Sequence, residues 1–289
     1  MGNIDISIIR KKNFEEGSRE RLVEDYCRKM ASQHTDGLIK RYNELLESRD
    51  GVYINSDLMK MVFPFYANSI ENRELYNLSI TNSAATLANE AYRRAILNPD
   101  IKRCIFLTGP YGAGKSFFAQ SLFENEKEKI IQNSIIYEGS ITPPAFDEKI
   151  DYALKNGVTP EIIALNPTLE LSMRNIRERK RRIGRDVIKS EVIDKFSNYY
   201  IYFKELIKKY KGIPFIIYNK ESNIPIDLDA GSKNIEDLNH GTSEEVSIEY
   251  DRIKEMLCLE EKKYKVIEVI SLEMIMGIDN RRTFWFYFL

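Results

Sequence analysis

One short segment limits the possible folds of this chain more than any other. Residues 104–118 read CIFLTGPYGAGKSFF, an apolar run followed by a glycine-rich turn and a stretch with helical character. The turn fits the pattern G-x-x-x-x-G-K-[ST], in which glycine lets backbone N–H groups point inward at phosphate oxygens while a helix begins. An apolar strand, this phosphate-binding loop (P-loop) and a helix in succession predict a nucleotide-binding protein of the α/β class. The P-loop comprises Gly109, Pro110, Tyr111, Gly112, Ala113, Gly114, Lys115 and Ser116.

Two P-loop side chains have expected roles of their own. Lys115 reaches the β- and γ-phosphates of a nucleotide, and the Ser116 hydroxyl holds Mg²⁺. We therefore expect ATP, or GTP, to bind with Mg²⁺ at residues 109–116; the alternative is a tight turn without function. Because P-loops serve kinases, ATPases and switches alike, the reaction depends on a residue that activates the nucleophile and on a cation that stabilises the transition state.

The rest of the chain alternates short apolar runs with helical stretches. Strands are expected at residues 52–57, 104–109, 134–139, 161–167 and 213–219. Helices are expected at residues 13–48 (one or two helices), 71–97, 114–131, 142–157 and 169–211. Strands that alternate with helices predict a mostly parallel sheet covered by helices.

This pattern divides the chain into three expected regions. Residues 1–48 form a helical N-terminal extension, 49–222 the P-loop core, and 223–289 an α+β appendage packed on the core. Within and just before the appendage, the sequence predicts a loop or linker at 220–245, a helix at 246–265, a strand at 266–271, and at 281–289 an aromatic strand or packing segment.

The bulk composition limits the classes of function. Of the 289 residues, 43% are hydrophobic and 30% are charged, which is typical of a globular protein with a sizeable core. The formal net charge of -1 gives no general reason to expect nucleic acid or an anionic membrane as a partner. No apolar run approaches the roughly 18 residues of a membrane span, and no secretory signal or disulfide framework is visible. We expect a cytoplasmic protein.

Two carboxylates lie at the ends of expected strands. Asp57 ends the segment 52–57, and Glu138 lies next to the end of the segment 134–139. Ligands of an open parallel sheet bind beyond the carboxyl ends of its strands, where the P-loop also lies, so both acids are expected to face the γ-phosphate. Asp57 suits a catalytic base that accepts the proton of an acceptor hydroxyl. The alternative for Asp57 is a helix N-cap.

A basic run supplies candidate cations. Residues 174–191 read RNIRERKRRIGRDVIKSE, and Gly184 is expected to interrupt their helix. Guanidinium groups clamp phosphate oxygens and stabilise charge that develops on a transferred group. We expect Arg185 and one of Arg177 or Arg179 to act in this way. The alternatives are a solvated helix face and a patch that binds a polyanion.

Taken together, these residues resemble the zeta toxin family, which are small-molecule kinases of bacterial toxin–antitoxin systems. The resemblance covers about residues 50–222. Its parts are GPYGAGKS at 109–116, IIYEGSITPP at 135–144, IIALNPTLELSMRNIRERKRRIGRDVIKSE at 162–191, FIIYNKES at 215–222, VYINSDLMKMVFP at 52–64 and YNLSITNSAATLANEAYRRAI at 76–96. The resemblance implies that Asp57 is the catalytic aspartate, that Glu138 helps to hold the substrate, and that the arginines belong to a lid.

The family also implies an acceptor and partners. The acceptor would be a UDP-activated amino sugar such as UDP-N-acetylglucosamine, the outcome growth inhibition, and the partner a neutralising antitoxin. Other nucleotides, including a dinucleotide ribose, are alternative acceptors. In the family, the segment with the catalytic aspartate lies between the P-loop and the Glu-Gly strand, whereas here it precedes the P-loop. Residues 124–133 leave no room for a missing strand and helix, so we expect a P-loop kinase core with reordered connectivity.

Two other functions stay open at this point. One is a nucleic-acid end kinase that uses the basic run as a track for the backbone, against which the net charge of -1 argues. The other is a nucleotide-dependent regulatory module without transferase activity, in which Asp57 would only cap its helix.

Overall fold

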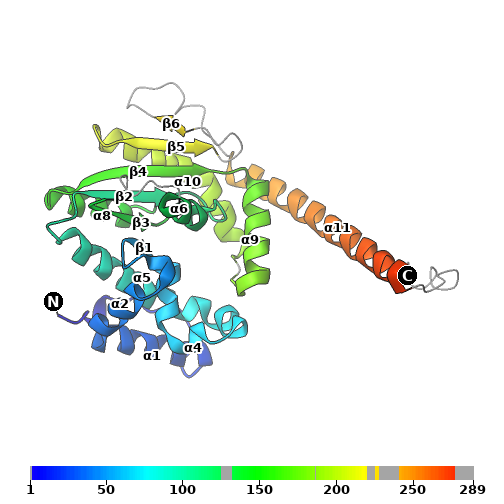
Figure 1. The fold of residues 1–289 in the computed structure, drawn as a ribbon, viewed down its shortest axis with the longest axis horizontal. Helices are drawn as coiled ribbons and strands as arrows, with labels where there is room; N and C mark the ends of the chain where they lie inside the picture. The colour runs from blue at the N-terminus through cyan, green and yellow to red at the C-terminus, as the bar shows by residue number, and fades with distance from the viewer. Residues whose placement is uncertain (1, 125–131, 186, 220–224, 228–240, 277–289) are drawn as a thin grey trace.

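A mostly parallel sheet forms the centre of the structure (Figure 1). The computed structural model describes residues 2–124, 132–185, 187–219, 225–227 and 241–276. Within these residues the sheet has six strands, in the order β1-β3-β2-β4-β5-β6. They are β1 (Tyr53–Asn55), β2 (Arg103–Thr108), β3 (Ser134–Glu138), β4 (Thr159–Asn166), β5 (Phe215–Asn219) and β6 (Pro225–Asp227). The first five are parallel, and β6 runs antiparallel to β5.

The strand order explains how an early segment reaches the P-loop. Strand β2, which leads into the P-loop, lies in the middle between β3 and β4. Strand β1 pairs with the outer side of β3, with Asn55 opposite Glu138. The expected α/β class, the parallel sheet and all five expected strands are therefore confirmed. Strand β6 was not expected, because its three residues lie in a polar stretch that resembles a linker.

Helices cover the sheet and its β1 edge. They are α1 (Arg19–Gln33), α2 (Thr35–Asn43), α3 (Ser56–Met59), α4 (Pro64–Ala67), α5 (Ile70–Ile96), α6 (Lys115–Glu124), α8 (Ala145–Lys155), α9 (Leu169–Ile183), α10 (Lys189–Lys209) and α11 (Ser243–Met276). The expected break at Gly184 is present: this glycine ends α9 with φ 69°, a left-handed conformation that favours glycine. Among the described residues, no helix has the length and apolarity needed to cross a membrane.

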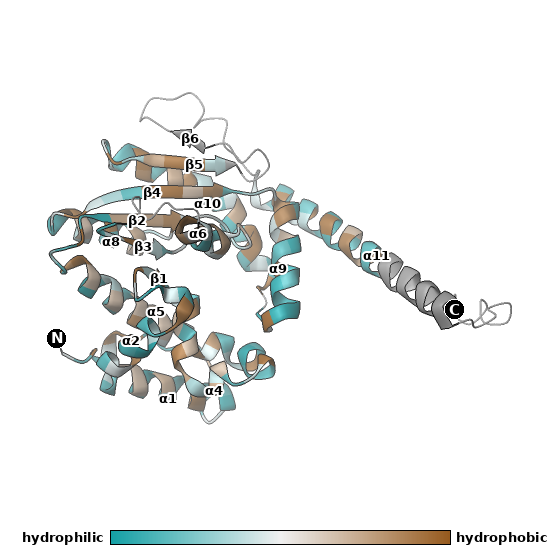
Figure 2. Ribbon diagram, in the orientation of Figure 1, coloured by the Kyte–Doolittle hydropathy of each residue, from teal (hydrophilic) through white to brown (hydrophobic). Residues whose placement is uncertain are grey.

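The N-terminal helices share their core with the sheet. Cys27, Leu38 and Tyr42 belong to the same cluster of buried apolar side chains as Phe106 of β2 and Phe203 of α10. Figure 2 shows the hydrophobic colouring along β2, β4 and β5, whereas α9 is largely hydrophilic. The division into three regions stays a prediction, but the first 48 residues pack as part of the main core.

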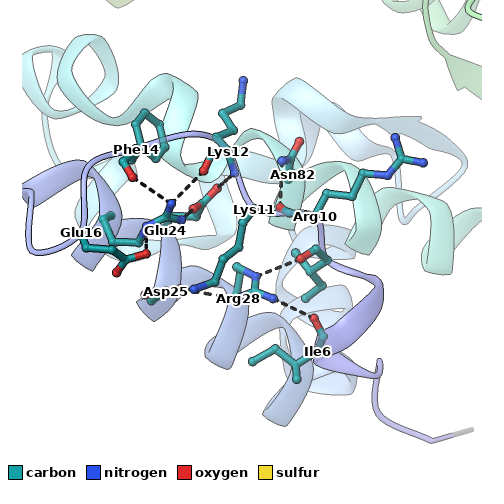
Figure 3. Close-up of polar contacts among 12 residues, drawn as sticks. Ile6, Arg10, Lys11, Lys12, Phe14, Glu16, Glu24, Asp25, Arg28 and Asn82 are labelled. Atoms are coloured by element: carbon teal, nitrogen blue, oxygen red, sulfur yellow. Dashed lines mark hydrogen bonds and ion pairs between the residues drawn. The ribbon is translucent and has the colours of Figure 1, made fainter.

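Polar contacts hold the segment that precedes α1 against that helix (Figure 3). Arg21, 5% exposed, forms an ion pair with Glu24, which is 0% exposed. Glu24 also accepts a hydrogen bond from the backbone N–H of Lys12 at 2.8 Å, and Arg21 donates to the carbonyls of Lys12 and Phe14 at 2.9 and 3.0 Å. Because a buried charge needs a partner, this pair fixes the path of the segment.

The C-terminal part contradicts one expectation. Val246, Ile253 and Leu257 of α11 pack against α9 and α10, and the helix then extends away from the body (Figure 1). The strand expected at 266–271 is wrong, because α11 continues through it to Met276. Its β-branched residues resemble a strand, but no Gly or Pro interrupts residues 246–276, so the helix can propagate. The aromatic end at 281–289 lies outside the described residues.

Candidate active site

The P-loop is pressed against the end of β4 and the start of α9. Gly109, Gly112 and Gly114 have φ values of 150°, 74° and 79°, which other residues rarely adopt. A Cβ on Gly109 would lie 2.8 Å from the carbonyl oxygen of Leu165, and a Cβ on Gly112 would clash with the carbonyl of Ser172. The glycines are therefore required both for the turn and for its packing.

Neighbouring polar groups hold the P-loop side chains. Lys115 donates to the carbonyls of Gly109 and Pro110 at 2.8 and 3.0 Å. Burial lowers the pKa of Lys115, Glu138 opposes that shift and nearby Arg179 adds to it. Asn175 of α9 donates to the carbonyl of Gly112 at 2.7 Å. The loop thus keeps a cation at its centre and is tied to α9.

The remaining P-loop residues pack or bound the cavity. Ala113 is buried, and Tyr111 packs on the apolar cluster between α9 and α11. Burial raises the pKa of Tyr111 to about 12. A cavity of about 480 Å³ lies between the P-loop, α6 and α9. Its lining includes Gly114, Phe117, Leu171, Asn175, Glu178 and Arg182.

Glu138 lies beside the P-loop serine. Ser116 Oγ donates to Glu138 Oε2 at 3.0 Å, and the buried hydroxyl of Tyr53 donates to the same oxygen. A hydroxyl and a carboxylate side by side are hard oxygen ligands, and Mg²⁺ typically takes one or two such groups and keeps several waters. These two residues therefore fit the expected ion. The described residues contain no group of three or more His, Cys, Asp or Glu that could hold a metal by themselves.

Asp57 lies in the first turn of α3, surrounded by cations. It forms ion pairs with Arg185 and, at 3.1 Å, with Lys60, whose Nζ also donates to Asn77 at 2.7 Å. Burial alone would raise the pKa of Asp57, but Arg185, Lys60 and Arg179 together hold it well below its usual range. The alternative role as N-cap is wrong, because Asn55 caps α3.

The structure distinguishes the two candidate arginines of α9. Arg177 and Arg181 form ion pairs with Glu261 of α11, so the structure does not bring Arg177 to the P-loop. Arg179 lies on the other side, near Asp57 and Glu138, and its buried Nε has no hydrogen-bond partner among the described residues. Burial and Arg185 lower the pKa of Arg179. Within the described part of the chain, no carboxylate forms an ion pair with this guanidinium, as would suit a group that binds an anionic ligand.

The structure thus gathers most of the expected site residues at the end of the sheet where the carboxyl ends of the parallel strands meet. Lys115, Ser116, Glu138, Asp57, Arg179 and Arg185 are together, and Arg177 is not. Sequence reasoning missed Lys60, Tyr53 and Asn55. Lys60 lies three residues after Asp57 and therefore on the same side of a helix. Tyr53 and Asn55 are two residues apart in β1 and therefore share one face of the strand. Both spacings are signals that could have identified these residues.

The fold and the site define a parallel α/β protein with a P-loop after its central strand and two acids beyond neighbouring strand ends. No protein-family model matches the chain, and no curated protein matches it either. The zeta toxin resemblance therefore rests on the segments quoted above and enters the argument as a proposal.

Proposed function

We propose that this chain is a kinase that transfers the γ-phosphoryl group of ATP, or GTP, to a hydroxyl group of a small molecule. The observation that carries the proposal is a convergence. Asp57 precedes the P-loop in sequence, yet the pairing of β1 with β3 places it at the carboxyl ends of the strands, with Lys115 and Glu138. Ligands of open α/β sheets bind beyond the carboxyl ends of the strands, which is where these three side chains meet.

Asp57 would act as the base once Arg185 leaves it. A carboxylate with a low pKa is a weak base, and Arg185 is the cation that lowers it most. When the γ-phosphate draws Arg185 away, the carboxylate becomes free to accept the hydroxyl proton of the acceptor. The acceptor oxygen then forms a bond to the γ-phosphorus, and the bond to the bridging oxygen breaks to leave a nucleoside diphosphate.

The other cations would stabilise the transferred group. Arg179 and Lys115 would bind the phosphoryl oxygens, and positive charge held in place there stabilises the negative charge that accumulates on them. Ser116 and Glu138 would hold Mg²⁺, which, when bound, neutralises charge on the β- and γ-phosphates. The 480 Å³ cavity beside Gly114 has the size of a small-ligand pocket and would receive the nucleoside.

The acceptor that we propose is a nucleotide sugar such as UDP-N-acetylglucosamine. This choice, and with it a zeta-type toxin role and an antitoxin partner, rests on the family resemblance. The nucleic-acid end kinase is less favoured, because Arg174, Arg177 and Arg181 of the basic run are paired with Glu260 and Glu261 and do not form an open track. A regulatory nucleotide-binding module is the second candidate, since the Asp57–Arg185 pair could be its resting state.

The test is transfer of a labelled γ-phosphoryl group to a panel of nucleotide sugars and nucleotides. We expect wild type to label an acceptor, and Lys115→Ala and Asp57→Asn to lose most of this activity. Arg179→Lys should lower transfer by about 10³-fold, as loss of an arginine finger does. Arg177→Lys is the matched control from the same helix and should change the rate by less than about threefold, because Arg177 faces Glu261 of α11 in a partly exposed ion pair and lysine keeps the charge.

Two results would contradict the proposal. ATP binding without any labelled acceptor would favour the regulatory module. Full activity of Asp57→Asn would leave the kinase assignment in place but would refute the role of Asp57 as the catalytic base.

A further inference from the structure

We propose that Asn55 and Tyr53 are positioning residues that fix the two carboxylates of the site relative to each other. Asn55 acts on Asp57 through the first turn of α3, and Tyr53 acts on Glu138 through its hydroxyl. The proposal rests on the proposed function, because it assigns Glu138 to the Mg²⁺ of a bound nucleotide.

The carboxamide of Asn55 makes contacts at both of its ends. Its Oδ1 accepts hydrogen bonds from the backbone N–H groups of Asp57 and Leu58 at 2.7 and 2.9 Å. Its Nδ2 donates to the hydroxyl of Tyr53 at 2.9 Å. Because the side chain is buried, neither contact is exchanged readily for water. One amide therefore sets both the start of α3 and the direction of the Tyr53 hydroxyl.

The hydroxyl of Tyr53 has one proton, and its neighbours decide where that proton goes. Since the hydroxyl oxygen accepts from Asn55, its proton is donated to Glu138 Oε2, the oxygen that also accepts from Ser116. Tyr53 is 2% exposed, so water does not compete for this hydrogen bond. Tyr53 thus stays a donor and orients the carboxylate, as partners of metal-ligating carboxylates do.

A second tyrosine, Tyr42, anchors this arrangement to the N-terminal helices. Tyr42 of α2 donates to the carbonyl of Tyr53 at 2.8 Å and accepts from the backbone N–H of Asn55 at 2.9 Å. Strand β1 has three residues and a single strand neighbour, so its outer backbone groups need other partners. The Tyr42 hydroxyl supplies them and holds the strand that carries both positioning residues.

The experiment measures ATP affinity by calorimetry as a function of Mg²⁺ concentration. For Tyr53→Phe we expect the metal-free affinity to stay within twofold of wild type, and the half-saturating Mg²⁺ concentration to rise by about tenfold or more, as for loss of an outer-shell partner of a metal ligand. Tyr92→Phe is the matched control: this tyrosine is buried and donates to the Lys149 carbonyl at 2.7 Å, away from the site, so its Mg²⁺ dependence should equal that of wild type.

A second pair of variants separates the two actions of Asn55. Asn55→Ser keeps an oxygen that can cap α3 but loses the donor to Tyr53, so it should resemble Tyr53→Phe in Mg²⁺ dependence. Asn55→Ala loses both, and its transfer rate should fall further than that of Asn55→Ser. In a Glu138→Gln background, Tyr53→Phe should change the Mg²⁺ midpoint by less than about twofold, because coupled residues are not additive.

The outcomes distinguish this inference from the proposed function. Wild type that binds no ATP refutes both. Wild type with Mg²⁺-dependent binding that Tyr53→Phe leaves unchanged refutes the inference alone. Additive effects of Tyr53→Phe and Glu138→Gln also refute it, since Tyr53 would then not act through Glu138.

Discussion

At the scale of single residues, Asp57 shows how neighbours that are remote in sequence set the chemistry of a carboxylate. Its place just after a strand follows from the local pattern, but its pKa does not. Arg185 lowers that pKa most and is contributed by the segment that follows α9. Distant neighbours also separate Arg177 from Arg179. The two arginines are two positions apart on a helix and therefore point to different sides.

The ion pairs of Asp57 predict a pH-dependent stability difference between wild type and Asp57→Asn. With its folded pKa depressed, the carboxylate contributes stability fully above its unfolded pKa of about 3.8, and this contribution is lost as pH falls through the lower folded value. At pH 7 the variant should be less stable, because Arg185 and Lys60 lose their partner. The difference should narrow as the pH falls below about 4.

Urea denaturation at pH 7 and at pH 3 measures this difference. Asp251→Asn is the control, since its ion pair with Lys189 is exposed and should contribute less than about 1 kcal/mol at either pH. Equal destabilisation by Asp57→Asn at both pH values would contradict the assigned pKa direction.

Among the elements, α9 packs closely against the P-loop. Gly112 leaves no space for a Cβ next to the backbone of Ser172, and Asn175 ties α9 to the carbonyl of Gly112. A change in the position of α9 would therefore move the phosphate-binding loop with it. Helix α9 also carries Arg179, so a shift of α9 would displace this side chain together with the P-loop.

This packing predicts that Gly112→Ala disables the loop. Gly112 and Gly157 have almost the same φ, 74° and 73°, but a Cβ on Gly157 meets nothing within 4 Å. Both variants carry the left-handed backbone penalty of about 1–2 kcal/mol. Only Gly112→Ala must also displace α9 or the loop, and its ATP affinity should fall by about tenfold or more, which corresponds to about 1.4 kcal/mol.

Calorimetric titration with ATP compares the two glycine variants. Gly157→Ala should bind ATP like wild type, and its cost should be visible only as a lower unfolding temperature. Equal ATP affinities for both variants would show that the Gly112 contact does not shape the loop.

At the scale of the whole molecule, the N-terminal helices and the sheet form one apolar core. Leu38 and Tyr42 share a buried cluster with Phe106 and Phe203, and Tyr42 also hydrogen-bonds β1. A domain with one such core usually unfolds in one cooperative step. The segment that precedes α1 should therefore stabilise the entire protein, including the P-loop that is remote from it.

Glu24→Gln tests this coupling. The substitution leaves the buried Arg21 without its buried charged partner, since Glu16, the other carboxylate near it, is largely exposed, and should lower the free energy of unfolding by about 3 kcal/mol. The side chain of Glu16 is 79% exposed. Glu16→Gln should therefore lower the free energy of unfolding by less than about 1 kcal/mol. Circular dichroism and release of a fluorescent ATP analogue, followed in urea, should show coincident transitions at a lower midpoint in Glu24→Gln. Two separate transitions would indicate that the N-terminal part unfolds independently.

Features that depend only on neighbouring residues could be predicted from the amino-acid sequence. The five parallel strands, the P-loop, the break at Gly184 and the acids at strand ends all follow from short patterns of apolar residues, glycine and charge. Each of these signals reflects local backbone preferences and burial, which a window of a few residues contains.

Features that depend on contacts between distant segments could not be predicted in this way and became apparent in the folded protein. The tertiary structure placed β1 beside β3, Glu138 on Ser116, Arg179 rather than Arg177 at the P-loop, and Asn55 rather than Asp57 at the cap of α3. Strand pairing, ion-pair choice and the side of a helix that meets the core are set by packing in three dimensions, and such packing overrides local propensity.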